Sequence, residues 1–463
     1  MDSSNETVKA PHRVCLLMAG GAGKRLWPSS RLLNPKPLLP LSSGRSLINE
    51  TVSLLSRRAR DITVLVGAAQ EAAFRSHIDS SVSARVEIAA EPLSRNTAPA
   101  IALGIMRAMP DIEEDEDIIF IVSPSDHHVG DKDGFLKAVE TAVAAAEKGF
   151  IVTIGIKPNR PETGYGYIQK GDAAEGAPQG VFKIGRFVEK PDLRTARRYV
   201  KQSFLWNSGI FVFRGRVMLE EIKKHAPGVF SAVRRSLSKE DSYGADTASY
   251  AKSPNISIDF AVMEKTELGA VVPASFEWDD VGSWESVYKL AKKDSDGNAV
   301  SGGAVVLNSK NCLVRSSGER VVAAEGLKGL VIVDEGDAVL VSDMKRAGKV
   351  KDVVDEVVAR GGGSEASRPL RTERAWGSER MIEKGGGFSV RSVHVSAKMD
   401  YQPQANASRV VVLEGEAVAI LGGKSVTLAE GDLLEAPDGV PLRVKNGGKL
   451  PLRLLEISFN EDG

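Results

Sequence analysis

Between residues 14 and 156, short β-rich apolar segments alternate with segments of helical period, and this alternation constrains the fold most strongly. A strand, a helix and a second strand form a right-handed crossover, and repeated crossovers build a mostly parallel, doubly wound α/β sheet. Ligands of such sheets bind beyond the carboxyl ends of the strands. The predicted strands are residues 14–19, 63–66, 86–89, 118–122 and 151–156, and the predicted helices are residues 47–58, 71–78, 98–109 (with Thr97 as its cap) and 135–148.

A glycine-rich turn, AGGAGKRLWPSS at residues 19–30, directly follows the first predicted strand. It is not the Walker loop of ATPases, because Arg25 stands where that loop requires a hydroxyl. It is not a dinucleotide-binding turn either, because Leu26 replaces the third glycine. Neither common phosphate-binding motif therefore describes this turn.

The turn still carries groups that suit a phosphate, since free backbone N–H groups bind phosphate oxygens and cationic side chains neutralise their charge. These groups are the backbones of Gly20, Gly21 and Gly23 and the side chains of Arg25, Arg31 and Lys36, the last fixed between two prolines. For the glycines alone, a tight turn without a ligand is the alternative interpretation. The added cations favour phosphate binding.

Two acidic residues follow predicted strands or turns. Asp126 ends the fourth predicted strand, where a lone carboxylate beside phosphates suggests Mg²⁺. The alternative is a turn-capping aspartate, which is common at strand ends. Asp280, in the sequence WDDVGSW at residues 278–284, offers a second acidic site.

Three further motifs carry groups that a sugar requires. GYGY at residues 164–167 and WNSG at residues 206–209 provide close backbone approach, an amide and a hydroxyl. FVEKP at residues 187–191 places the Glu189 carboxylate beside the Lys190 ammonium in one extended piece. Each motif taken singly is more typical of scaffold than of a site, and only their order favours a function.

Length and charge exclude several classes of protein. A chain of 463 residues is long enough for two or three domains. Lys plus Arg and Asp plus Glu both number 61, so no net field attracts nucleic acid or an anionic membrane. No apolar run approaches the roughly 20 residues of a membrane span. The polar N-terminus does not resemble a signal peptide, and the two distant cysteines suggest reduced thiols. These features predict a cytoplasmic protein with neither nucleic-acid nor membrane partners.

After residue 290 the pattern changes to short β segments about ten residues apart. We expect strands at residues 304–307, 320–323, 330–333 and 338–341, in a short, irregular β-helix. The predicted domains are residues 1–290, a β-helical segment with a closing helix at 291–360, a flexible glycine-rich linker at 361–369 and an all-β sandwich or barrel at 370–463.

The motifs together resemble those of a known family in order and spacing. They are residues 20–31 with PKP at 35–37, EP at 91–92 with RNTAPA at 95–100, SDH at 125–127, FVEKP at 187–191, WNSG at 206–209, residues 257–265 and WDDVGSW at 278–284. They resemble the mannose-1-phosphate guanylyltransferases, in the long form that is fused to a type II phosphomannose isomerase domain. The resemblance covers nearly the whole chain. It implies a Rossmann-like nucleotidyltransferase, a β-helical segment and a C-terminal cupin.

The resemblance also implies roles. In this family a sugar phosphate attacks the α-phosphorus of GTP, so the partners would be GTP and mannose 1-phosphate and the cofactor Mg²⁺. The nucleotide would be held by Gly20, Gly21, Gly23, Arg25, Arg95, Asn96 and Thr97. Lys36 and Arg25 would act in catalysis, with Asp126 and Asp280 as Mg²⁺ ligands. Gly164, Glu189 and Asn207 would bind the sugar, and Lys190 its phosphate. Transfer to a different sugar 1-phosphate and a catalytically weak regulatory homologue are the alternatives.

The cupin-like domain departs from the family pattern. The family's metal site needs a glutamine and a histidine-rich stretch with a glutamate, and residues 404–409 read QANASR instead. Leu442 stands at the family's later histidine, and His394 is the last histidine of the chain. We therefore expect a cupin fold with neither catalytic metal nor isomerase activity. Three roles stay open for it: support of a homodimer, shielding of the catalytic domain, or binding of a regulator.

Overall fold

A computed structural model describes residues 12–21, 23–41, 44–79, 82–110, 117–238, 244–318, 320–374, 376–403 and 407–459. The chain forms two compact units. The first comprises Met1–Gly21, Lys36–Glu71 and Asp79–Leu290, and the second comprises Ala22–Pro35, Ala72–Ile78 and Ala291–Gly463. Within the described ranges, no helix is both long and apolar enough to cross a membrane.

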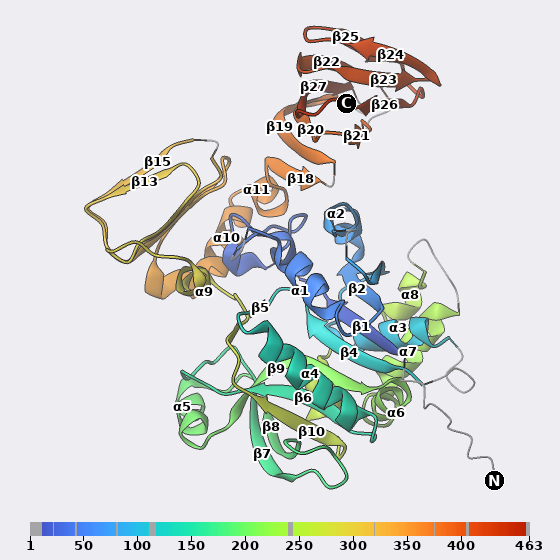
Figure 1. The fold of residues 1–463 in the computed structure, drawn as a ribbon, viewed down its shortest axis with the longest axis vertical. Coiled ribbons are helices and arrows are strands. Elements are labelled where there is room, and N and C mark those ends of the chain that lie inside the picture. The colour runs from blue at the N-terminus through green and yellow to red at the C-terminus, as the bar shows by residue number, and fades with distance from the viewer. Residues whose placement is uncertain are drawn as a thin grey trace, which may run out of the picture. The chain divides into compact units, whose positions relative to one another are not determined.

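The first unit is built on a nine-stranded sheet (Figure 1). Its strands are β1 (Arg13–Met18), β2 (Asp61–Gly67), β3 (Arg85–Glu91), β4 (Ile119–Pro124), β6 (Ile151–Ile156), β7 (Tyr167–Ala173), β8 (Phe182–Val188), β9 (Leu205–Arg214) and β10 (Gly269–Ala274). They lie in the order β3-β2-β1-β4-β9-β6-β10-β8-β7. The short strands β5 (His128–Val129) and β11 (Trp278–Asp279) pair with each other.

The sheet is mixed, which corrects the mostly parallel sheet of the prediction. Strands β1 to β4 pair in parallel, as do β6 and β10. Strand β9 is antiparallel to β4 and β6, and β8 is antiparallel to β7 and β10. The alternation of strand and helix ends after β6, since a turn rather than a crossover helix joins β7 to β8, and such a hairpin is necessarily antiparallel.

Apolar helices complete the first unit, and α3 shows how closely they pack. Residues 98–106 of α3 are all buried. A Cβ at Gly104 would lie 2.9 Å from Leu16 Cδ1, so the glycine lets the helix approach β1. Asn96, and not Thr97 as predicted, caps α3, because its side chain accepts a hydrogen bond from the Thr97 N–H. The helices up to residue 290 are α1 (Leu47–Leu55), α2 (Glu71–His77), α3 (Thr97–Ala108), α4 (Lys132–Ala146), α5 (Leu193–Lys201), α6 (Gly215–His225), α7 (Pro227–Leu237), α8 (Thr247–Tyr250) and α9 (Trp284–Leu290).

A short β-helix begins the C-terminal part of the second unit. Its strands are β12 (Ala299–Ser301), β13 (Ala304–Leu307), β14 (Leu313–Ser316), β15 (Val322–Glu325), β16 (Leu330–Asp334) and β17 (Val339–Asp343). Parallel pairs β12–β14, β14–β16 and β13–β15 stack successive coils around buried Cys312, Val314 and Ile332. Helix α10 (Val350–Ala359) follows. Helix α11 (Gly363–Ser367) lies where the glycine run predicted a flexible linker, so that prediction is wrong for these five residues.

Residues 22–35, the second half of the glycine-rich segment, fold with the second unit. The Arg31 side chain is fully buried, and its Nη1 and Nη2 each lie 2.5 Å from an Asp337 carboxylate oxygen. Its Nε donates to the Pro28 carbonyl at 2.8 Å. The prediction that Arg31 neutralises a phosphate is therefore wrong, because the buried guanidinium forms an ion pair with Asp337 inside the second unit.

The cupin at the C-terminus consists of two antiparallel sheets. Its strands are β18 (Arg371–Arg374), β19 (Gly377–Gly385), β20 (Phe388–Val395), β21 (Asp400–Tyr401), β22 (Ala407–Glu414), β23 (Ala417–Leu421), β24 (Lys424–Leu428), β25 (Leu433–Ala436), β26 (Leu442–Lys445) and β27 (Leu452–Phe459). The sheets have the orders β18-β19-β20-β27-β22-β25 and β21-β26-β23-β24. Alternate residues such as Val393, Val412 and Leu454 are fully buried between them, and so is Leu442, at 4 % exposure.

Candidate active site

A pocket of about 230 Å³ lies at one edge of the sheet in the first unit. Met18 and Pro124, the last residues of β1 and β4, line it. Asn207, near the start of β9, also lines it, and β9 is antiparallel to β4. The pocket therefore lies beyond the carboxyl ends of the parallel strands, which is where the alternation predicted a ligand.

Polar residues of this pocket carry buried atoms that no described residue satisfies. These atoms are Glu189 Oε2, His127 Nδ1 and Trp278 Nε1. Buried polar atoms in folded proteins are nearly always hydrogen-bonded, and an unpaired one requires an explanation. The three residues also line the pocket, so buried polar groups without partners gather around it.

Glu189 lies at the pocket wall directly after β8. A Cβ at Gly166 would lie 2.5 Å from Glu189 Oε2, so only glycine permits this approach. The Lys190 ammonium contacts Glu189 Oε1 at 2.8 Å, and the Lys190 side chain is 65 % exposed. Lys190 has φ +46, so this segment is not extended as predicted. Lys190 is not one of the described residues that line the pocket.

Asn207 is held from both sides. Its Oδ1 accepts from the Thr153 hydroxyl at 3.1 Å, and its Nδ2 donates to Asp259 Oδ1 at 2.9 Å. Asp259 also lines the pocket, and burial, followed by the nearby Glu189 carboxylate, raises its pKa to about 6. Asp259 belongs to the motif at residues 257–265, but no role for it was predicted from the sequence.

Lys36 connects the two predicted Mg²⁺ ligands. Its ammonium lies 2.9 Å from Asp126 Oδ2 and donates to the backbone carbonyl of Asp280. Burial alone would raise the pKa of Asp126, but the Lys36 ammonium and His127 outweigh it, so the pKa lies below its usual value. Burial lowers the pKa of His127, although the Asp126 carboxylate opposes this. The structure thus brings Lys36, Asp126 and Asp280 together from three distant parts of the sequence.

The Asp280 side chain is oriented by two donors. The Tyr165 hydroxyl donates to its Oδ1 at 2.8 Å, and the Gly282 N–H donates to the same oxygen at 3.0 Å. A Cβ at Gly282 would lie 2.6 Å from Asp280 Oδ2, so this turn requires glycine. Burial, and then the Asp280 charge, raise the pKa of Tyr165, which keeps its hydroxyl protonated.

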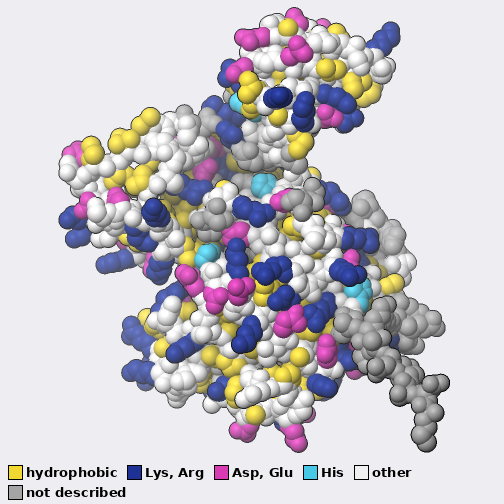
Figure 2. All heavy atoms as spheres, viewed as in Figure 1, with side chains coloured by type: hydrophobic (Ala, Val, Ile, Leu, Met, Phe, Trp, Pro, Cys, Tyr) yellow, Lys and Arg dark blue, Asp and Glu magenta, His cyan; other side chains and the backbone are white. Residues whose placement is uncertain are grey.

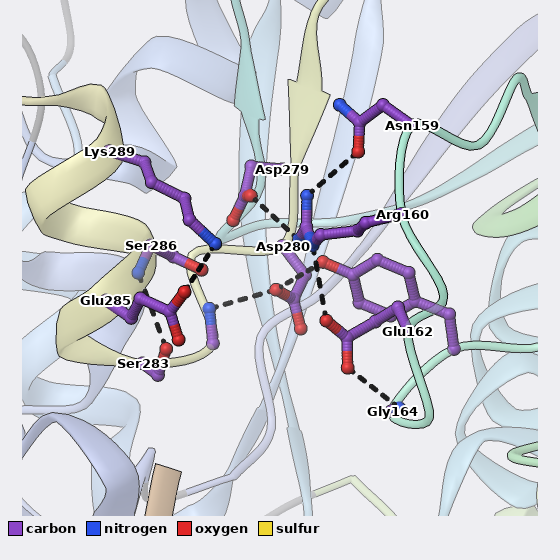
Figure 3. Close-up of polar contacts among 12 residues, drawn as sticks. Asn159, Arg160, Glu162, Gly164, Asp279, Asp280, Ser283, Glu285, Ser286 and Lys289 are labelled. Carbon is purple, nitrogen blue, oxygen red and sulfur yellow. Dashed lines mark hydrogen bonds and ion pairs between the residues drawn. The ribbon is translucent and has the colours of Figure 1, made fainter. Parts of the chain in front are cut away.

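A second chain of contacts fixes the loop that carries Gly164. Arg160 reaches Asp279 Oδ2 and Glu162 Oε2, both at 3.4 Å, and Glu162 Oε1 accepts from the Gly164 N–H at 3.2 Å (Figure 3). The Gly164 N–H is therefore engaged within the protein. Its predicted contact with a sugar would have to come from its Cα or its carbonyl.

The comparisons with known proteins agree with this geometry. The sequence matches the Nucleotidyl transferase family over residues 14–297, the MannoseP isomerase/GMP-like beta-helix domain over 302–357 and the Cupin domain over 395–458. The alginate biosynthesis protein AlgA of Pseudomonas aeruginosa is 36 % identical, over 96 % of this chain and 92 % of its own. A mannose-1-phosphate guanylyltransferase of Klebsiella pneumoniae is 36 % identical, over 96 % of this chain and 95 % of its own.

The chain belongs to the mannose-1-phosphate guanylyltransferase family of nucleotidyl transferases. The resemblance found in the sequence is thereby confirmed, including its fused β-helix and cupin. A crystal structure from Thermus thermophilus, described as a mannose-1-phosphate geranyltransferase, is 37 % identical with a TM-score of 0.66. It covers 75 % of this chain and 99 % of that one.

The remaining predicted residues of this nucleotidyl transferase lie on several elements. Gly20 and Gly21 follow β1, and Gly21 has φ +115, which favours glycine. Gly23 and Arg25 belong to the second unit, and the Arg25 side chain is exposed. Of the three residues before or at the start of α3 (Arg95, Asn96 and Thr97), Thr97 lines the pocket, and its hydroxyl accepts from the Ile258 N–H at 2.9 Å. Their roles toward a nucleotide stay predictions.

Glu91 is a second residue whose environment the sequence did not reveal. It ends β3 at only 6 % exposure, and the Tyr250 hydroxyl donates to its Oε2 at 2.9 Å. Burial raises its pKa to about 7, opposed by the Tyr250 hydrogen bond and by Arg107. A Cβ at Gly20 would lie 3.9 Å from Glu91 Oε1, so the carboxyl group lies beside the first glycine of the turn.

Proposed function

We propose that this nucleotidyl transferase transfers GMP from GTP to mannose 1-phosphate, giving GDP-mannose and pyrophosphate. The observation that carries the proposal is the set of unsatisfied buried polar atoms on Glu189, His127 and Trp278 around one small pocket. Its volume of about 230 Å³ is below the ~300–1,000 Å³ of sites for drug-sized ligands, which suits a single sugar ring. The relatives named as mannose-1-phosphate guanylyltransferases support the choice of sugar.

The residues suit a reaction that requires positioning more than acid–base chemistry. A sugar phosphate is already ionised at neutral pH, so its oxygen can attack a phosphorus without a general base. Glu189 would accept hydrogen bonds from the sugar hydroxyls, and the Asn207 amide would donate to them. Gly164 would also contact the sugar, and Lys190 would bind its phosphate. Lys36 would stabilise the negative charge that develops at the phosphate. Gly20, Gly21, Gly23 and Arg25, with Arg95, Asn96 and Thr97, would hold the GTP.

The carboxylates of Asp126 and Asp280 would be the ligands of Mg²⁺, with Asp280 lining the pocket and Asp126 Oδ2 lying 2.9 Å from the Lys36 ammonium. Mg²⁺ is usually held by one or two carboxylates plus substrate phosphates and water, so a pair is sufficient. Asp280 Oδ1 already accepts two hydrogen bonds, but a carboxylate has about four acceptor sites, which leaves capacity for a cation. No cluster of three or more metal-ligating side chains occurs in the part of the chain that the structure describes. When bound, Mg²⁺ would neutralise phosphate charge.

Purified protein assayed with four nucleoside triphosphates against several sugar 1-phosphates, with pyrophosphate release as the readout, tests this proposal. We expect GTP with mannose 1-phosphate to give the highest turnover, and EDTA to abolish it. A preference for UTP or dTTP, or activity that EDTA leaves unchanged, would contradict the proposal. Best turnover with another sugar 1-phosphate would favour the first alternative, and binding without turnover would favour the regulatory one.

The cupin is proposed to lack isomerase activity. A cluster of buried apolar side chains, Leu442 among them, occupies part of the space between its sheets. Gln404, the one remaining residue of the family's metal-site glutamine pattern, lies outside the described residues. Nucleic acid is not proposed as a partner, because Lys and Arg side chains are interspersed with Asp and Glu on the face in Figure 2. A cytoplasmic location and a homodimer stay predictions from the sequence.

A further inference from the structure

The pocket of the first unit holds an acidic side chain near Glu189 that has no part in the reaction described so far, namely Asp259. Asp259 is the first residue of a short π-helix, η4 (Asp259–Met263). The residue before it is tied to the start of α3, because the Thr97 hydroxyl accepts from the Ile258 N–H at 2.9 Å. This contact fixes the backbone from which the Asp259 side chain reaches the pocket.

Contacts on both sides of the Asn207 amide determine its orientation. The Gly209 N–H, which can only donate, lies 3.2 Å from Asn207 Oδ1. The Asp259 carboxylate, which only accepts when it is ionised, lies 2.9 Å from Asn207 Nδ2 through its Oδ1. The orientation of an asparagine amide follows from such a network, so Gly209 and Asp259 together hold the NH2 group on the side of Asp259. Asp259 takes one of the two hydrogens of this group, and the second is left to donate to a ligand.

Glu189 and Asn207 approach the same part of the pocket wall. A Cβ at Gly166 would lie 2.5 Å from Glu189 Oε2 and 3.6 Å from Asn207 Nδ2, so an acceptor and a donor flank this glycine. Glu189 Oε2 is buried without a hydrogen-bond partner among the described residues. A hydroxyl both donates and accepts, so one sugar hydroxyl can donate to Glu189 while it accepts from Asn207. With the amide reversed, two acceptors would face that hydroxyl, and its single hydrogen could serve only one of them.

The position of Asp259 is unfavourable in the protein without a ligand. Burial, followed by the Glu189 charge, raises the pKa of Asp259 to about 6, although a hydrogen bond with Ser257 and the Lys190 charge oppose this. The Lys190 side chain that pairs with Glu189 is 65 % exposed, so water screens its charge. Two acidic groups kept close together in this way cost stability, and such costs are typical of functional sites.

We propose that Asp259 is a positioning residue of the sugar site: it holds the Asn207 amide so that Asn207 donates to the hydroxyl that donates to Glu189. The proposal rests on the proposed transfer to a sugar 1-phosphate, in which Glu189 and Asn207 contact the sugar. Asp259 then acts only through Asn207, so loss of either side chain should remove the same contact.

Steady-state kinetics of full-length variants tests the proposal. Asp259→Ala should raise the KM for mannose 1-phosphate about tenfold, the scale of a hydrogen bond to a charged group, and leave the KM for GTP within about twofold. Asp259→Asn keeps a carbonyl that can accept from Asn207, so its KM for mannose 1-phosphate should lie within about threefold of the wild-type value. Asp172→Ala removes an exposed carboxylate on β7 of the same unit, and this control should leave both KM values unchanged.

A double-mutant cycle distinguishes positioning from a merely structural role. Asp259→Ala added to Asn207→Ala should raise the KM for mannose 1-phosphate by less than about twofold over Asn207→Ala alone, because the side chain through which Asp259 acts is gone. Thermal unfolding of each variant shows whether it is folded, and the nearly isosteric Asp259→Asn replaces Asp259→Ala in the cycle if the alanine variant is not. Effects that multiply in the double variant, or equal rises in both KM values, would overturn the proposal.

The same variants separate this proposal from the proposed function. If another sugar 1-phosphate or nucleotide gives the best turnover, transfer of GMP to mannose 1-phosphate is wrong, and the cycle is measured with that pair. Coupling between Asp259 and Asn207 would then still support the positioning role. If no pair gives turnover, calorimetric titration with mannose 1-phosphate supplies dissociation constants for the same cycle. Absence of binding by the wild-type protein would contradict both proposals.

Discussion

The pocket of the first unit and the barrel interior of the cupin differ in the side chains that line their buried volume. In the pocket, Glu189 and His127 keep buried polar atoms without partners in the described protein. In the barrel, a cluster of apolar side chains forms the core, and the fully buried Glu456 accepts hydrogen bonds from Tyr401 and Ser458. Other buried polar atoms of the cupin, Glu379 Oε2, Arg391 Nη1 and Ser408 Oγ, lack hydrogen-bond partners in the described protein. Unsatisfied buried groups cost stability and are retained where they serve a ligand, whereas satisfied groups and dense packing stabilise a fold. Substitutions in the pocket should therefore change activity, and substitutions in the barrel should change stability.

The largest expected effect is on turnover in Lys36→Met, which removes the ammonium but keeps the hydrophobic stem. We expect kcat to fall by roughly 10²–10³, the scale for losing one preorganised group that stabilises charge. Lys289→Met is the matched control, because this lysine pairs with Glu285 at 2.7 Å on the surface of α9 and should leave kcat near normal. Near-normal turnover of Lys36→Met would mean that Lys36 serves only the structure.

In the barrel, the substitution Leu442→Ala should lower the stability of the protein and leave its turnover unchanged. Leu442 is 4 % exposed within the core, and a Leu-to-Ala change in a core costs about 2–5 kcal/mol of unfolding free energy. Leu450→Ala is the control, since Leu450 is 79 % exposed and its loss should cost less than about 0.5 kcal/mol. Urea unfolding measures both. A large loss of guanylyl transfer in folded Leu442→Ala would break the separation between the two regions.

The sequence predicted which residues meet at the pocket better than it predicted the pairing of the strands or the partner of Arg31. Gly164, Glu189 and Asn207 come together because each motif lies near one end of a strand, and strand ends at one sheet edge are close in space. The burial of Arg31 depends on Asp337, 306 residues away, and no local pattern indicates such a partner. The mixed pairing was missed for the same reason, because β9 inserts between β4 and β6 from far along the chain.

A smaller effect is expected in Glu189→Ala. This change should raise the KM for mannose 1-phosphate by roughly tenfold or more, the scale of a hydrogen bond to a charged group, and leave the KM for GTP within about twofold. Steady-state kinetics with each substrate varied in turn measures the two KM values separately. Glu285→Ala, at a surface ion pair of the same unit, is the control. An equal rise in both KM values would place Glu189 outside the sugar site.

The pH dependence of stability tests the buried Glu91, whose carboxyl group lies beside Gly20. Its pKa rises from an ordinary 4.5 to about 7 in the folded protein, so the folded state holds a proton that the unfolded state releases in this range. Stability contributed by the protonated group is therefore lost as pH rises from about 4.5 to 7, by about 3 kcal/mol at most. Glu91→Gln should remove this dependence. Parallel pH profiles of unfolding free energy for wild type and variant would contradict the assignment.

The smallest expected effect is none: the protein should not convert mannose 6-phosphate to fructose 6-phosphate. A zinc site of this type requires imidazole ligands, and His394, the last histidine of the chain, lies on a strand between the buried Val393 and Val395 and so points away from the barrel core. Leu442, at the family's later histidine position, is packed in that core. The buried carboxylate of Glu456 is engaged by Tyr401 and Ser458 and has no imidazole beside it to complete a metal site.

Elemental analysis of the purified full-length chain, alongside a coupled isomerase assay, measures this absence. A metal-containing phosphomannose isomerase serves as the positive control for the assay, and guanylyl transfer by the same preparation shows that the protein is folded. Proton transfer between adjacent sugar carbons in such a domain depends on the metal, so the two readouts should agree. Stoichiometric zinc together with measurable isomerisation would show that the barrel, like the pocket, holds a reactive site, and the contrast between the two regions would fail.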